Sequence, residues 1–228
     1  MGYFAAKILV VALILLGGLA AFPLGALAAA RRSRRRHARM PSSRGLGGAA
    51  CAGLLLHRER LAAIRVTAGA APLAERYAPQ AGEIVLSDEV AAGISVYDAA
   101  AAAFQVAKVA LHADGDADFV RGYGRAKVVG WLTNLFPVVL LIGLAVPGEG
   151  RAFLALVAPL ILVFLVGYTA LTLPGERRAA TRALALLDRY GFVRDAGERD
   201  RLRAALAARA ALTLATPLTR CYWIAWAL

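Results

Sequence analysis

Cysteine and histidine are scarce in this chain of 228 residues, which holds 2 cysteines and 3 histidines. Cys51 and Cys221 stand far apart, so the sequence predicts neither a disulfide framework nor a cysteine pair for zinc. His37, His57 and His112 show none of the spacings that place two imidazoles on one helix face within reach of the same metal. A glycine-rich phosphate loop and other cofactor motifs are also missing, so we expect no cofactor.

Acidic residues are in the minority, because 15 Asp and Glu stand against 27 Lys and Arg, for a formal net charge of +12. No helix-turn-helix, zinc finger or aromatic-interleaved basic patch accompanies this charge, so we expect no nucleic-acid partner. The densest basic cluster consists of Arg31, Arg32, Arg34, Arg35 and Arg36. A cluster that directly follows an apolar run is typical of a topology signal and of a binding site for anionic lipid headgroups.

Hydrophobic residues make up 60% of the chain, and several long stretches carry few charges. Residues 1–30 contain Lys7 as their one charge, and residues 123–174 contain two apolar runs on either side of Pro147–Arg151. Roughly 20 apolar residues suffice for a helix to cross a bilayer. The sequence therefore predicts an integral membrane protein, mainly α-helical, with three to four transmembrane helices. A cleavable signal peptide is the alternative for the first run, and the arginine cluster behind it disfavours cleavage.

The distribution of arginine predicts an N-terminus outside the cell and a main domain in the cytoplasm. The expected segments are a transmembrane anchor (1–30), a basic juxtamembrane linker (31–45), a small α+β domain (46–122), a transmembrane hairpin (123–174), cytoplasmic or interfacial helices (175–203) and a C-terminal membrane-associated or transmembrane helix (204–228). Arg209 and Arg220 interrupt the last segment, where a buried arginine would be costly in lipid. Tyr222, Trp223 and Trp226 are candidate interface residues for a neighbouring protein or for lipid.

Within the α+β domain, the hydrophobic pattern predicts helices over residues 49–60 and 95–112. Residues 64–67 and 83–86 are short and rich in β-branched side chains, so they predict strands. Ser87 stands before Asp88 and Glu89, which suits a helix cap. No histidine partner for Ser87 is indicated, so we do not expect a nucleophile there.

Several short motifs follow one another in a fixed frame. They are Leu73-x-x-x-Tyr77-x-Pro79, then Ile84-Val85-Leu86-Ser87-x-x-Val90, then Gly93-x-Ser95-Val96 with the alanine-rich helix, and further on Thr172-Leu173-Pro174-Gly175-Glu176. Together they resemble the bacterial membrane-anchored neutral zinc metallopeptidases (YugP-like), whose frame reads approximately L-x-D-H-Y-D-P, V-x-L-S-x-x-V, G-x-S-V, A-A-H-E-V-G-H and T-L-P-V-E. The resemblance implies a zincin-like domain, a place in the bacterial inner membrane, and Glu176 as the third zinc ligand.

The catalytic positions of that family are replaced in this chain. A His-Glu-x-x-His helix supplies two zinc ligands one turn apart and a general base, whereas these positions hold Phe104, Gln105 and Lys108. Phenylalanine has no lone pair, glutamine is no base near neutral pH, and an ammonium repels a dication. We therefore expect no catalytic residue and no bound metal, with Glu176 and His112 as residual metal candidates.

Two functions follow from this pattern. The first is a non-catalytic pseudo-metallopeptidase, a structural or accessory subunit of a larger membrane protein complex with other integral membrane proteins as partners. The smooth alanine face from Ala99 to Ala110 would suit such a contact, and its packing on the chain's own hairpin is the alternative. The second is a membrane-bound zinc metallopeptidase with an altered site of His112, Glu176 and Asp114. A catalytic zinc needs three protein ligands, and Lys108 stands at a ligand position, which favours the first.

Overall fold

A computed structural model describes residues 25, 27–70, 75–124 and 172–227, with side chains up to residue 212. The chain divides into two units. One combines Met1–Ala28, Arg121–Leu173 and Leu212–Leu228, and the other combines Ala29–Val120 with Pro174–Ala211. The second unit, which we call the core domain, holds the sheet and the residues singled out by the sequence.

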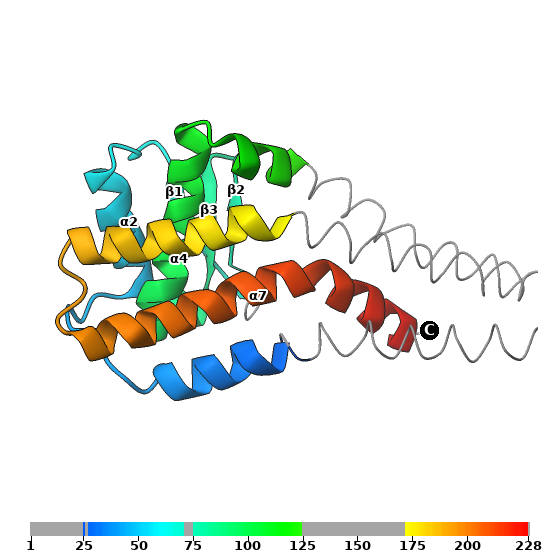
Figure 1. Cartoon of the computed structure of the whole chain (residues 1–228), viewed down its shortest axis with the longest axis horizontal. Coiled ribbons are helices and arrows are strands. Elements are labelled where there is room, and N and C mark those ends of the chain that lie inside the picture. Colours follow the sequence, from blue (N-terminus) through cyan, green and yellow to red (C-terminus); the bar gives the residue numbers. More distant parts are fainter. Residues whose placement is uncertain (1–24, 26, 71–74, 125–171, 228) are drawn as a thin grey trace, which may run out of the picture. The chain divides into compact units, whose positions relative to one another are not determined.

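Figure 1 shows the helices and strands of the described residues. In chain order they are a helix of residues 27–37, α2 (Gly48–Arg58), β1 (Arg65–Gly69), β2 (Arg76–Ala78), β3 (Glu83–Ser87), α3 (Asp88–Ala92), α4 (Val96–Ala113), a helix of residues 117–124, a helix of residues 172–189, and α7 (Ala196–Ala227). The predicted helices over 49–60 and 95–112 are confirmed as α2 and α4. The predicted strands over 64–67 and 83–86 are confirmed as β1 and β3.

The sheet has three strands in the order β1-β3-β2. β3 lies in the centre, parallel to β1 and antiparallel to β2. Ile84 and Leu86 alternate on its buried face, as the two-residue period of a strand requires. β2 was not predicted, because three residues next to Pro79 are too few to show a periodic pattern. β2 nevertheless matters, since it carries Tyr77 and follows Glu75 directly.

Two side-chain caps fix the N-terminal starts of the helices that follow β3. The Ser87 hydroxyl accepts a hydrogen bond from the Val90 backbone amide at 3.4 Å, which confirms the predicted cap. At α4, the Ser95 hydroxyl accepts from the Asp98 amide at 3.2 Å while the Asp98 carboxylate accepts from the Ser95 amide at 3.0 Å. This reciprocal pair satisfies two backbone donors that a helix start would otherwise leave free. The start of α4 is therefore fixed in position.

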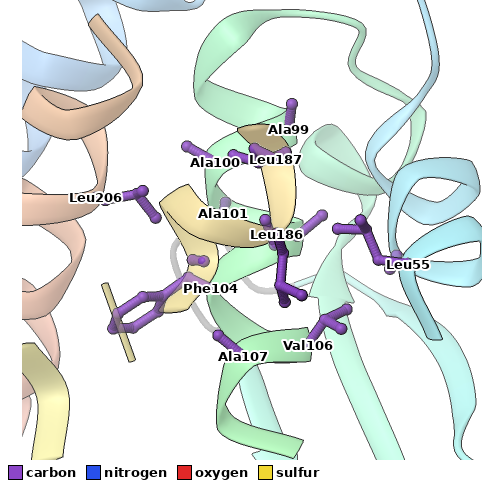
Figure 2. Packing of buried hydrophobic residues seen from close by; sticks show 14 of the residues in the cluster. Leu55, Ala99, Ala100, Ala101, Phe104, Val106, Ala107, Leu186, Leu187 and Leu206 are labelled. Carbon is purple, nitrogen blue, oxygen red and sulfur yellow. The ribbon is translucent and has the colours of Figure 1, made fainter. Parts of the chain in front are cut away.

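α4 forms the centre of the core domain, and every side chain from Val96 to Leu111 is buried. Figure 2 shows its small and apolar side chains among Leu55 of α2, Leu186 and Leu187 of the 172–189 helix, and Leu206 of α7. Alanine lets helices approach closely, and here the neighbours belong to the same chain. The face from Ala99 to Ala110 is thus used inside the domain and does not serve as a surface for a partner.

The prediction of an integral membrane protein with three to four transmembrane helices is contradicted. Among the helices that the structure describes, none combines the length and the apolar character that a membrane crossing needs. The predicted anchor (1–30) and hairpin (123–174) lie almost entirely outside the described residues. The same finding contradicts the predicted location, a multi-pass protein of the bacterial inner membrane with its N-terminus outside.

The C-terminal segment 204–228 was predicted to be membrane-associated or transmembrane, and it forms the second part of α7. Of the two alternatives, the membrane crossing is contradicted, because α7 is not apolar enough to span a bilayer. Arg209 was expected to be costly in lipid, but it lies inside the core domain with its side chain 2% exposed, paired with Glu75. The charge of Arg209 within this alanine-rich helix therefore indicates a buried residue of opposite charge.

Candidate functional site

The three replaced positions lie on α4, and one of them, Lys108, contacts an acidic side chain. The Lys108 ammonium lies 2.9 Å and 2.8 Å from the two carboxylate oxygens of Glu176, which the 172–189 helix supplies. It also lies 4.7 Å from the centre of the Phe104 ring, within the range of a cation–π contact. The Lys108 and Glu176 side chains are 10% and 14% exposed. The Lys108 ammonium and the Glu176 carboxylate therefore neutralise each other at a position with little access to water.

Gln105, the third replaced position, has a structural contact. Its side-chain amide donates a hydrogen bond to the backbone carbonyl of Glu75 at 3.2 Å. Its carbonyl oxygen is buried and has no hydrogen-bond partner among the described residues. Gln105 thus holds the start of β2 against α4. An amide cannot take up a proton near neutral pH, so this contact offers positioning and no acid–base chemistry.

The Glu75 side chain is the centre of a second charged cluster, deeper than the first. It is fully buried and lies 2.6 Å from the Arg209 guanidinium of α7. The Ser87 hydroxyl donates to its other oxygen at 2.8 Å, and Arg209 donates to the Tyr97 hydroxyl at 3.4 Å. Burial acts to lower the pKa of Arg209, but the Glu75 carboxylate and the Tyr97 hydroxyl outweigh it and raise that pKa. Arg209 stays charged.

This second cluster was missed from the sequence. Glu75 falls at the aspartate of the L-x-D-H-Y-D-P frame in the resembling family and was not singled out, and Arg209 was noted only as an interruption of an apolar segment. Their opposite charges could have indicated that Glu75 and Arg209 form a pair. An acidic and a basic residue that each lie in apolar surroundings both require a counter-charge.

The residual metal candidates are held apart by other partners. The His112 Nδ1 lies 2.8 Å from the Tyr77 hydroxyl, and the two rings meet edge to face with centroids 5.7 Å apart. Asp114 lies 3.5 Å from Arg182, and Glu176 is paired with Lys108. Within the described parts of the chain, no group of three or more His, Cys, Asp or Glu side chains could hold a metal ion.

A zinc ion does not fit the residues present at the replaced positions. Phe104 has no lone pair to donate to a metal. The Lys108 ammonium is already paired with the Glu176 carboxylate, which the resemblance implies as a zinc ligand. A dication would have to displace a cation that is tethered to the chain. Zinc binds nitrogen, sulfur and oxygen donors. These positions offer it one carboxylate, whose charge is already neutralised.

The remaining candidate residues are the arginine cluster, Cys51 and three aromatic residues near the C-terminus. The arginine cluster lies on the helix of residues 27–37, where Arg34 pairs with Glu89 of α3. Cys51 is a free, buried thiol, and burial raises its pKa to about 12, so it is inert. Tyr222, Trp223 and Trp226 fall in the last part of α7, whose side chains lie outside the described residues.

The core domain thus has a three-stranded sheet and a buried central helix, on which Phe104 and Lys108 stand one helical turn apart and Lys108 contacts a glutamate from a later helix. The sequence matches the family described as "Putative neutral zinc metallopeptidase" over residues 10–224, and the chain belongs to that family. No curated protein and no solved structure matches the chain.

Proposed function

We propose that this chain is a non-catalytic member of the neutral zinc metallopeptidase family, degenerate at the His-Glu-x-x-His motif and related to its YugP-like branch. The observation that carries the proposal is the contact of the Lys108 ammonium with both carboxylate oxygens of Glu176. The chain supplies its own cation at the position where the family would bind a metal. Phe104 lies against the same ammonium, so the former ligand position also stabilises the substitute.

Three chemical arguments support the absence of peptidase activity. Metal-assisted hydrolysis needs a metal with an open position for water. It also needs a base close to that water, and Gln105 is an amide whose donor is bonded to the Glu75 carbonyl. An ammonium buried against a carboxylate has no open coordination position and polarises no water. These residues hold the helices together and do not form a reaction centre.

The alternative, a peptidase with an altered metal site, has less support. It requires His112, Glu176 and Asp114 to converge on one ion. In the structure they contact Tyr77, Lys108 and Arg182 respectively. The alternative would therefore need Glu176 and Asp114 to leave their cationic partners and to converge with His112 on one ion.

Elemental analysis of the purified wild-type chain is expected to find no stoichiometric zinc, and peptide substrates are expected to remain uncleaved. The variant Phe104→His/Gln105→Glu/Lys108→His is expected to bind about one zinc per chain, because it restores two ligands one turn apart and frees Glu176. Zinc near one per chain in the wild type, lost on chelation together with peptidase activity, would overturn the proposal.

The matched control for this experiment is Phe104→His/Gln105→Glu, which retains Lys108. It adds one ligand and the base but leaves the ammonium on Glu176, so it is expected to remain free of zinc. Circular dichroism of both variants verifies that α4 is still formed. Zinc binding by the control at the level of the triple variant would show that Lys108 does not block the site.

We propose further that the retained domain serves as a structural or accessory subunit of a larger protein complex. The support is that the residues at the replaced positions are packed inside the domain, since Gln105 bonds to the Glu75 carbonyl and Lys108 pairs with the largely buried Glu176. These contacts stabilise the fold although the catalytic residues of the family are absent. The contact surface lies elsewhere than the alanine-rich face, which the domain itself covers.

Native mass measurement after in-cell crosslinking is expected to show the chain together with other proteins, and the identity of those proteins tells whether they are membrane proteins. A parallel sample with Lys108→Met/Glu176→Met, which removes an ion pair whose side chains are 10% and 14% exposed, is expected to retain the same partners. A monomer with no crosslinked protein would contradict the assembly role.

A further inference from the structure

The helix of residues 172–189 is attached to the core domain differently along its two halves. Its second half supplies the buried side chains of Leu186 and Leu187, which Figure 2 shows against the small residues of α4. Before residue 182, the side chains that join the hydrophobic core among the described residues are two alanines, Ala179 and Ala180. A methyl group buries far less apolar area than a leucine side chain. Hydrophobic packing therefore holds the second half more strongly than the first.

Ion pairs hold the first half instead. The Arg178 Nη1 lies 2.8 Å from a carboxylate oxygen of Asp116, and its Nη2 lies 2.6 Å from a carboxylate oxygen of Asp118. One guanidinium thus bridges two carboxylates of the segment that follows α4, using the two arms of its planar fork. One turn further along the helix, Arg182 lies 3.5 Å from Asp114 of the same segment. We call Arg178, Asp116 and Asp118 the ionic latch.

The acidic side of the latch is fixed in position, and its basic side is open to solvent. The second carboxylate oxygen of Asp116 accepts a hydrogen bond from the Phe119 backbone amide at 2.9 Å. That hydrogen bond and the Arg178 guanidinium lower the pKa of Asp116. The Arg178 side chain is 51% exposed, so dissolved salt screens its ion pairs far more than it screens a buried pair.

Glu176 lies in the half of the helix that the latch holds. Its carboxylate contacts Lys108 of α4 and stands two residues before Arg178. Separation of this half from α4 would part Glu176 from Lys108 and place the carboxylate in water. The second half would stay in place, because Leu186 and Leu187 anchor it in the core. Proteins open locally in this way where few apolar contacts hold a segment.

We propose that the ionic latch controls a local opening of the first half of the 172–189 helix, and with it the access of water and dissolved ions to Glu176. At low ionic strength the latch keeps this half on α4. At high ionic strength the latch weakens, and the half opens more often while the rest of the domain stays folded. The device depends on the attachment of the helix and is separate from the absence of peptidase chemistry.

Thiol labelling of the full-length chain measures this opening. The variants Ala179→Cys in the first half and Ala205→Cys on α7 each place a thiol at a position that is 0% exposed, with Cys221→Ser in both. Adding Arg178→Met is expected to raise the labelling rate at position 179 about fivefold and to change the rate at position 205 by less than about twofold. Raising NaCl from about 0.05 M to about 1 M is expected to raise the rate at position 179 about threefold, but only when Arg178 is present.

Arg199→Met is the matched control. Arg199 is also 51% exposed and lies 2.7 Å from Asp188, near the other end of the same helix. Its removal is expected to change labelling at position 179 by less than about twofold. Asp116→Asn/Asp118→Asn retains an acceptor for the Phe119 amide and is expected to raise labelling as Arg178→Met does. Combining the two is expected to add little, because both remove the same contacts.

Three results overturn the proposal. The first is an unchanged labelling rate at position 179 after Arg178→Met. The second is an equal rise at positions 179 and 205, which would show that the whole domain is destabilised. The third is a response to salt that is the same with and without Arg178, which would show that the opening does not depend on the latch.

Discussion

Replacing Arg209 with Met is expected to lower the free energy of unfolding by about 4 kcal/mol. The reason is the carboxylate left behind. Glu75 is fully buried, and without the guanidinium the Ser87 hydroxyl is its one remaining side-chain donor among the described residues. Urea unfolding followed by circular dichroism measures the loss. Arg203→Met, at an exposed position of the same helix, is the matched control and is expected to change the value by less than about 0.5 kcal/mol.

The double variant Glu75→Gln/Arg209→Met distinguishes a charge effect from a packing effect. Removing both charges is expected to recover at least about half of the lost free energy, because an uncharged pair needs far less solvation than a lone buried carboxylate. A double variant as unstable as Arg209→Met alone would show that the arginine acts through its packing volume, and the interpretation of this cluster as an ion pair would be wrong.

Lys108→Met is expected to cost about 3 kcal/mol in the free energy of unfolding, somewhat less than Arg209→Met. Glu176 loses its cation but is 14% exposed, so water solvates part of the carboxylate. Adding Glu176→Met to this variant is expected to restore most of the stability, since Met fills a similar volume without a charge. The same urea titration measures both, and Lys108→Met without any loss would contradict the central role of the pair.

Chelation provides a complementary measurement on the wild type. If the Lys108 ammonium replaces a metal as the structural cation, a strong chelator is expected to leave the unfolding midpoint unchanged. A metal-dependent domain would unfold at lower urea in the chelator, because metal binding contributes folding free energy. A shift of that kind would contradict the proposed function as well.

Local elements were predictable because their signals are local. Ser87 and Ser95 stand directly before helices, and a capping side chain acts within three residues. The boundaries of α4 and β3 followed from the same short-range patterns. What the sequence could not place were contacts between distant parts, such as that of Tyr97 with Arg209 across 112 residues. The surroundings of Arg209 were predicted wrongly, as lipid instead of the interior of the protein.

The resemblance to a family supplied what periodicity could not. It indicated that Glu176 belongs with positions 104 and 108, and the structure brings Glu176 and Lys108 into contact. The sequence showed that Lys108 would repel a metal, but it did not indicate that the ammonium would pair with the remaining ligand. That step depends on side-chain reach across two helices, which spacing alone does not give.

The core domain is discontinuous along the chain, and this has a consequence for folding. α4 is enclosed by α2 and β3 before it in sequence and by the 172–189 helix and α7 after it. Contacts such as Glu59 with Tyr190 close a loop of 131 residues, and long-range closure slows folding. During synthesis, the alanine-rich helix emerges from the ribosome well before the helices that cover it. The nascent chain therefore carries an exposed apolar helix for the time needed to make the intervening residues, which makes this interval the stage at which a chaperone would be required.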